Sequence, residues 1–357
     1  MCTSRPADST VIIDPQKHDY YSGRTVTPPS IRYSSPSAPA TGLALFVLAL
    51  ALLATPLSAG IAAAQSAVST DVGVSAWVTS GYTKFSFADA GINPRSELSW
   101  RGTDFVMGEA RADVVWRTLV LRLSVGGGQP DGGVLLDDDY LLTGRQARES
   151  HTRSIVDGSH AFYANGDVGY RVHQWHEPMS GTRGFVDVFV GYQYWEEEYE
   201  AFGFTGVSGV PPFEPVLPQS LPKSTKGITE KYSFHSARIG ARAVVPLGAG
   251  FAWRVDGAVF PYTRSQLVDI HHLRPDLRQD PSGRATAYGG FGYQLDAAVT
   301  YDVWKGLSVE AGYRFWRLDS GTGRLTLFGS DGTTARVRLN EIIIERGGPY
   351  VGLQYRF

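Results

Sequence analysis

The sequence has very little cysteine, because Cys2 is the only one among its 357 residues. A single thiol cannot form a disulfide within the chain, and it cannot build a metal site from several cysteines. Charge of one sign is lacking as well, since 33 lysines and arginines stand against 35 aspartates and glutamates. The net charge of -2 offers a polyanion little attraction, so we expect no nucleic-acid partner.

Long hydrophobic runs are also missing, apart from one in residues 42–55. This run stops at Pro56, which makes it short for a membrane-spanning helix. Small residues follow as far as Ala64. An apolar core, a helix breaker and small residues are the layout of a secretory signal, so residues 42–64 are expected to be a signal peptide cleaved near Ala64.

The first 41 residues are rich in serine and proline and show no hydrophobic period. We therefore expect residues 1–41 to be a disordered extension. A signal peptide rarely carries so long a prefix, and a start codon assigned too far upstream is one explanation. Residues 65–357 would then be the exported part, which is long enough for one large domain.

Aromatic residues are plentiful at 12%, and apolar residues recur at every second position from Val72 onward. This period is typical of strands with one apolar face. Charged residues take the alternate positions, as Arg238 and Arg242 do among apolar neighbours. Ten segments follow the pattern: 72–78, 106–116, 119–125, 164–172, 186–194, 237–245, 251–259, 291–303, 307–315 and 351–357.

An even number of such strands behind a signal peptide predicts a barrel in a membrane. The apolar faces would meet lipid, and the charged faces would meet one another inside. Closure leaves no unpaired strand edge, which is the condition for crossing a bilayer. A soluble lipocalin-like barrel is the alternative, but its interior would be apolar. We therefore predict an all-β, ten-stranded antiparallel transmembrane β-barrel of the outer-membrane type over residues 65–357.

The connections between these strands alternate between short turns and long loops. Bacterial barrels place short turns in the periplasm and long loops outside the cell. Two acidic clusters, Asp137–Asp139 and Asp269 with His271, then lie at the outer rim. Short turns are expected near 116–118, 174–182, 246–250 and 303–306, and long loops near 85–97, 127–160, 196–230, 263–284 and 318–335.

Asp269 and His271 are two positions apart, so in an extended segment they point to the same side. A carboxylate can orient an imidazole and raise its basicity, although such a pair in a loop is usually solvated surface. Facing Asp137, the pair could activate a water, with His271 taking its proton and Asp139 supporting Asp137. Asp138 should point away from the site.

Metal binding is a rival use for the same side chains together with His272. Carboxylates and imidazoles are common metal ligands. No spacing typical of a metal motif accompanies them, so no metal site is predicted.

The chain resembles the omptins, the ten-stranded outer-membrane proteases of Gram-negative bacteria. The family's Asp-x-Asp and Asp-x-His match Asp137, Asp139, Asp269 and His271, which the resemblance implies are catalytic. It implies an aspartic-type endopeptidase in the outer membrane, with its site facing the cell exterior and peptides or proteins as substrates. The resemblance runs in order through Ser80–Lys84, Ser96–Trp100, Gly132–Tyr140, Glu149–Ser150, Tyr163–Asn165, Gly191–Gln193, Asp269–His271 and Tyr355–Phe357.

The chain departs from the family at two positions of the substrate pocket. Omptins that cut between basic residues have acidic side chains there, and this chain has Phe85 and Leu267. The resemblance therefore implies a pocket for an apolar or aromatic residue rather than dibasic specificity. The family also needs lipopolysaccharide, bound partly by basic residues, and Glu196–Glu198 stand in that stretch. This weakens the expectation of lipopolysaccharide as an activator, and no other cofactor is expected.

Two functions of different classes remain open on the sequence. One is the surface endopeptidase, which the four retained residue types favour. The other is a catalytically inactive omptin-fold barrel with a binding or structural role, because a fold does not imply a function. A passive pore fits less well, since inward Arg238, Arg242, Arg254 and Arg314 with acidic partners should fill the lumen.

Overall fold

The computed structural model describes residues 68–178, 183–208 and 220–357, which form one sheet of thirteen strands. No helix in these three ranges is long and apolar enough to cross a membrane. The expected extension over 1–41 and signal peptide over 42–64 lie outside the described residues.

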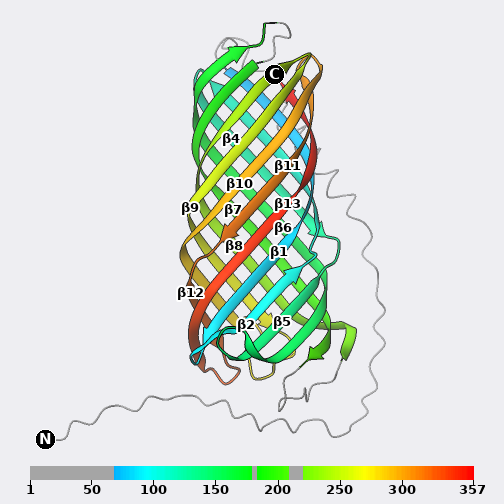
Figure 1. The fold of residues 1–357 in the computed structure, drawn as a ribbon, viewed down its shortest axis with the longest axis vertical. Helices are drawn as coiled ribbons and strands as arrows, with labels where there is room; N and C mark the ends of the chain where they lie inside the picture. Colours follow the sequence, from blue (N-terminus) through cyan, green and yellow to red (C-terminus); the bar gives the residue numbers. More distant parts are fainter. Residues whose placement is uncertain (1–67, 179–182, 209–219) are drawn as a thin grey trace, which may run out of the picture. The chain divides into compact units, whose positions relative to one another are not determined.

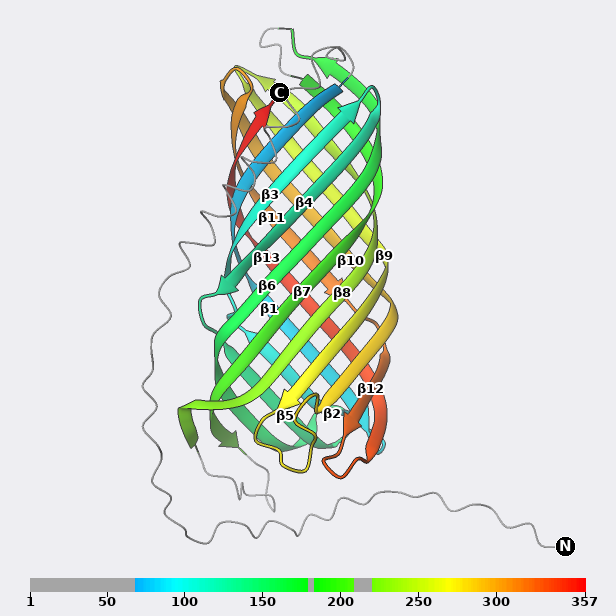
Figure 2. The ribbon, with the colours of Figure 1, turned by 180° about the vertical axis from the view of Figure 1, so that it is seen from behind.

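Ten of the strands close into a ring, as Figures 1 and 2 show from opposite sides. Neighbours along the ring pair antiparallel, and pairing of the first strand with the last closes it. The predicted ten-stranded barrel is thereby confirmed. The ring consists of β1 (Val68–Asp89), β3 (Phe105–Trp116), β4 (Leu119–Pro130), β6 (Gln146–His176), β7 (Arg183–Ser208), β8 (Ser220–Gly248), β9 (Phe251–His271), β10 (Gly283–Trp304), β11 (Leu307–Asp319) and β13 (Thr334–Arg356).

Three further strands prolong the barrel at one end. β2 (Ile92–Arg101) and β5 (Val134–Leu142) pair with each other and fill the gap between β1 and β6. β12 (Gly323–Phe328) lies between β10 and β13. In Figure 2 all three labels lie at the end opposite the C-terminus. We call this the site end.

The sequence predicted long loops at the site end. For the described residues this prediction was wrong, because the ring strands extend into most of these stretches. β1 continues to Asp89, β6 begins at Gln146 and β9 continues to His271, so most of these stretches are strand. The physical reason is that each segment still has a neighbour to satisfy its backbone groups. The alternation is reversed there, with apolar side chains such as Leu267 and Leu325 inward and polar ones such as Arg264 and Arg324 outward, so these stretches do not match the pattern of the ring strands.

The outward face of every ring strand carries exposed apolar side chains. They alternate with inward polar ones, as the period of two predicted. We call this surface the apolar belt, and it suits contact with hydrocarbon because the closed ring leaves no backbone group unpaired there. One exposed member from each ring strand is Val78, Val106, Leu121, Val168, Val190, Ile239, Val255, Leu295, Val309 and Val351.

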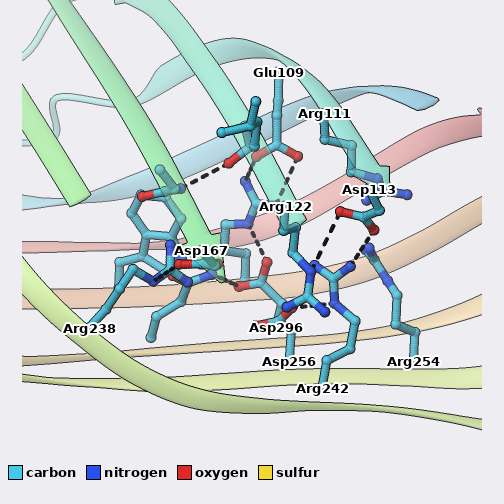
Figure 3. A pocket seen from close by; sticks show the side chains of 16 residues that line it. Glu109, Arg111, Asp113, Arg122, Asp167, Arg238, Arg242, Arg254, Asp256 and Asp296 are labelled. Atoms are coloured by element: carbon cyan, nitrogen blue, oxygen red, sulfur yellow. Dashed lines mark hydrogen bonds and ion pairs between the residues drawn. The ribbon is translucent and has the colours of Figure 1, made fainter. Parts of the chain in front are cut away.

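Ion pairs fill the lumen inside the apolar belt (Figure 3). Arg242 donates to Asp256 Oδ2 at 2.5 Å and to Asp113 Oδ2 at 2.6 Å. Arg314 donates to Glu109 Oε2 at 2.9 Å from the facing wall. The cavity among these side chains measures about 30 Å³, which is room for one or two waters. A continuous water-filled channel therefore does not fit through this layer of the described residues.

Candidate active site

A bulge near Pro261 turns the predicted residues of β9 into the lumen. Even-numbered side chains from Ala252 to Phe260 are buried, whereas odd-numbered ones are buried from Thr263 to Asp269. The register with β8 shifts at this point by one extra residue in β9. Proline suits a bulge because it has no N–H to give to the ladder. Without this shift, Asp269 would have pointed out of the barrel.

Asp269 and His271 form the pair that the sequence predicted. His271 Nε2 lies 3.1 Å from Asp269 Oδ2, and the Asp269 side chain is almost fully buried. The backbone N–H of His271 donates to Ser282 Oγ at 2.9 Å. The N–H of Ser282 in turn donates to the carbonyl of Asp269 at 2.8 Å. The start of β10 thereby fixes the end of β9, and the imidazole with it.

The imidazole of His271 is strongly basic for a partly buried ring. Burial alone would disfavour its charge, but the charge and hydrogen bond of Asp269 raise the pKa of His271 to about 9. Asp137 and Glu230 add smaller contributions in the same direction. The ring lies beyond Tyr262, the last exposed aromatic residue of β9, and so beyond the apolar belt. At neutral pH this imidazole holds a proton.

The opposite wall of the site end carries Asp137 and Asp139 on β5. Ser150 Oγ on β6 donates to Asp139 Oδ2 at 2.8 Å. Burial, together with the charge of Asp139, raises the pKa of Asp137 well above its usual range. Asp138 points away as predicted, because its Oδ1 lies 2.6 Å from His151 Nδ1.

The two walls are close enough for their charges to interact. The charges of His271 and Asp269 both act on the Asp137 carboxyl, although the strands that carry them are far apart in sequence. The structure therefore brings the four predicted residues to one site. His272 lies apart, with its Nε2 2.9 Å from Thr229 Oγ1. Within the described ranges, no three His, Cys, Asp or Glu side chains are arranged to hold a metal ion.

Phe85 and Leu267 lie in one apolar cluster of the barrel interior. Both are buried, with 2% and 0% of their surface exposed. Phe85 is paired across its strands with Leu98 and Ile342. The two positions therefore bring no carboxylate that could pair with a basic side chain of a substrate.

Glu230, which the sequence did not single out, is a fully buried residue of β8 that pairs in register with Asp269. Trp100 Nε1 donates to Glu230 Oε2 at 2.5 Å, and the Tyr232 hydroxyl donates to the same oxygen. Burial and the charge of Asp269 raise the pKa of Glu230 to about 8. The sequence did carry a signal for this residue. Even-numbered side chains of β8 point inward at Arg238 and Arg242, and the same alternation continues back along the strand to Glu230.

A second missed pair lies fully buried among the inward side chains. Arg346 Nε on β13 donates to Glu197 Oε1 on β7 at 2.8 Å, and both side chains are fully buried. Thr83 Oγ1 donates to Glu197 Oε2 at 2.5 Å. These contacts tie together three strands that are distant in sequence.

The fold is similar to that of one outer-membrane protein of known structure, although the sequence itself matches no family. No family model and no curated protein matches the sequence. The structure is similar to that of the outer membrane protease OmpT from Escherichia coli, with a TM-score of 0.61 and 15% identity, covering 82% of this chain and 97% of that chain. The translocator domain of autotransporter NalP from Neisseria meningitidis aligns with a TM-score of 0.31 and 9% identity, covering 89% of this chain and 98% of that chain. At these identities the likeness to OmpT shows an omptin-like outer-membrane barrel fold.

Proposed function

We propose that the protein is an omptin-like endopeptidase of the outer membrane of a Gram-negative bacterium, with its site facing the cell exterior. The observation that carries this proposal is the meeting of Asp137, Asp139, Asp269 and His271 at one end of the barrel. Support for the location comes from the apolar belt and from the similarity in fold to an outer membrane protease.

The proposed reaction is hydrolysis of a peptide bond by a water held between His271 and Asp137. Neutral His271 takes a proton from the water as the water oxygen bonds to the carbonyl carbon. Asp269 stabilises the imidazolium that forms, through the contact at 3.1 Å. The imidazolium then gives its proton to the leaving amine as the C–N bond breaks. Burial and the charge of Asp139, which Ser150 holds in place, raise the pKa of Asp137, and the Asp137 carboxyl holds the water by a hydrogen bond.

The proposed substrates are peptides or proteins with an apolar or aromatic residue before the scissile bond. This preference follows from Phe85 and Leu267, because an arginine placed against apolar side chains would lose its hydration without gaining a carboxylate.

Outer-membrane lipid is proposed to surround the apolar belt, and lipopolysaccharide is proposed as an activator. The stretch where the family pattern expects a basic residue carries Glu196, whose carboxylate pairs with Lys231 Nζ at 2.9 Å. Any positive charge for lipid phosphates must therefore come from elsewhere. Exposed arginines on the outer walls of β10 and β12, Arg284 and Arg324, offer such charge beyond the apolar belt.

The proposal is tested by a cleavage assay on the refolded protein, with and without lipopolysaccharide. The peptide library varies the residue before the scissile bond, and His271→Ala serves as the inactive reference. We expect cleavage after apolar or aromatic residues that the variant loses. Equal, background cleavage by folded wild type and variant would instead support the inactive surface barrel with a binding or structural role.

A further inference from the structure

Glu230 and Asp269 form a pair of carboxyl groups beneath the candidate active site. They are register partners on the neighbouring strands β8 and β9, and both side chains point into the lumen. Partners of this kind have Cβ atoms about 5 Å apart. Both are buried, with 0% and 3% of their surface exposed. Two carboxyl groups are thus held side by side away from water.

Each of the two carboxyls has one oxygen that is engaged and one that is not. Glu230 Oε2 accepts from Trp100 and Tyr232, and Asp269 Oδ2 faces His271. Glu230 Oε1 and Asp269 Oδ1 are buried, and no described residue donates a hydrogen bond to either. Two ionised carboxylates could offer each other only repulsion, because an ionised carboxylate has no proton to donate. One proton between them would satisfy both free oxygens.

We propose that Glu230 is a positioning residue that carries this proton, donating from its carboxyl to Asp269 Oδ1 while Asp269 Oδ2 orients His271. The site would then be a chain of three groups, Glu230, Asp269 and His271, rather than a pair. The role of Glu230 in catalysis rests on the proposed function. The proton shared with Asp269 does not depend on that function. Glu230 is fully covered and does not touch substrate in this arrangement.

The surroundings of Glu230 favour its protonated form. Asp269 and His271 face it from β9, Tyr232 from its own strand and Trp100 from β2. Asp137 interacts with it from β5. Burial and the Asp269 charge place its pKa near 8, so the proton is present at neutral pH and is lost as the pH rises through that value. Ionisation would add negative charge beside His271 and hold the imidazole in its protonated, inactive form.

Infrared difference spectroscopy of the folded wild type and Glu230→Gln tests the proton directly. We expect a band from a protonated carboxyl at pH 7 that is absent in the variant and disappears in the wild type above about pH 8. Glutamine keeps the shape, an acceptor for Trp100 and a donor for Asp269, so folding should be retained. Glu198→Gln, whose side chain is partly exposed beside Lys231, is the matched control and should keep the band. Spectra of wild type and Glu230→Gln that match at pH 7 would overturn the proposal.

The effect on His271 is measured separately by NMR titration of its imidazole. Glu230→Gln should lower the pKa of His271, because Glu230 has lost its proton by the pH at which His271 titrates and the variant removes that negative charge. A purely structural role would leave this titration unchanged in a folded variant, and that result would also overturn the proposal. Neither measurement needs peptide cleavage, so failure of the proposed function would be seen independently.

In an active protein, Glu230→Leu should lower kcat about tenfold or more and leave KM unchanged, because Asp269 loses its donor while the substrate loses no contact. A rise in KM with kcat unchanged would contradict the positioning role.

Discussion

His271 is held from two sides, by Ser282 at its backbone and by Asp269 at its ring. This arrangement fixes the direction in which the other ring nitrogen can accept a proton. It also makes the imidazole basic, with a pKa of about 9. A general base with so high a pKa is effective when neutral, but only a small fraction of it is neutral at pH 7. The pKa of His271 therefore sets the pH dependence of the proposed reaction.

The first prediction concerns that pH dependence. Below about pH 9, kcat/KM should rise roughly tenfold per pH unit, because cleavage needs neutral His271 and each unit frees about ten times more of it. Above that value it should level off. Rates measured between pH 6 and 10 on one peptide would check this. A plateau reached near the ordinary histidine pKa would contradict the role given to Asp269.

Asp269→Asn should lower the pKa of His271, because it removes the charge that opposes the burial penalty. Cleavage should fall about 100-fold or more, since the imidazolium loses its stabilising carboxylate. NMR titration of His271 measures the first effect without any substrate. Asp138→Asn is the control, because Asp138 points away from the site and pairs with His151. An unchanged His271 titration in Asp269→Asn would contradict the geometry.

At the scale of the elements, the sequence predicted the ten ring strands because one face of each is apolar along the apolar belt. It also placed Asp137 and Asp269 at one rim. It did not predict β2, β5 and β12, because these strands are short and turn apolar side chains such as Leu98, Leu135 and Leu325 inward instead of outward. Glu230 was missed because the predicted strand began only at residue 237, although the same alternation continues back to Glu230. Strict alternation of side chains continued past Pro261 would have placed Asp269 on the outer face. The bulge adds one residue to β9 and so turns Asp269 inward.

The elements at the site end are held together by buried charge, which predicts unequal effects of two similar substitutions. Arg346→Met should lower the free energy of unfolding by about 3–5 kcal/mol, because Glu197 is left charged and fully buried. Arg317→Met should change it by about 0–1 kcal/mol, because its pair with Glu345 is partly solvated. Urea unfolding of both variants in the same lipid or detergent makes the comparison. Equal losses would contradict a charged Glu197.

At the scale of the whole barrel, an apolar outer surface and the candidate active site lie at different heights along the strands. The half with the apolar belt has an outer face suited to lipid and a lumen filled by ion pairs such as Arg242 with Asp113 and Asp256. The site end carries the candidate active site beside the apolar cluster of Phe85 and Leu267. The ion pairs close the lumen between the two halves, so substrate would enter and leave on one side only.

This closure predicts that the refolded barrel does not conduct ions across a planar bilayer. The network at Arg242 and Arg314 leaves room for only one or two waters, which is too little for a hydrated ion to pass. Single-channel recordings at neutral pH would check this, with an open porin as the positive reference. Steady conductance steps from inserted wild-type barrels would show that the lumen is open and would favour a pore.

An active site at His271 is best tested by comparing His271→Ala with His272→Ala in one cleavage assay. The two residues are adjacent, but only the first faces Asp269, while the second contacts Thr229. We expect His271→Ala to lower kcat/KM about 100-fold or more and His272→Ala to stay near the wild type. Equal activity in both variants, with both shown to be folded, would contradict an active site at His271.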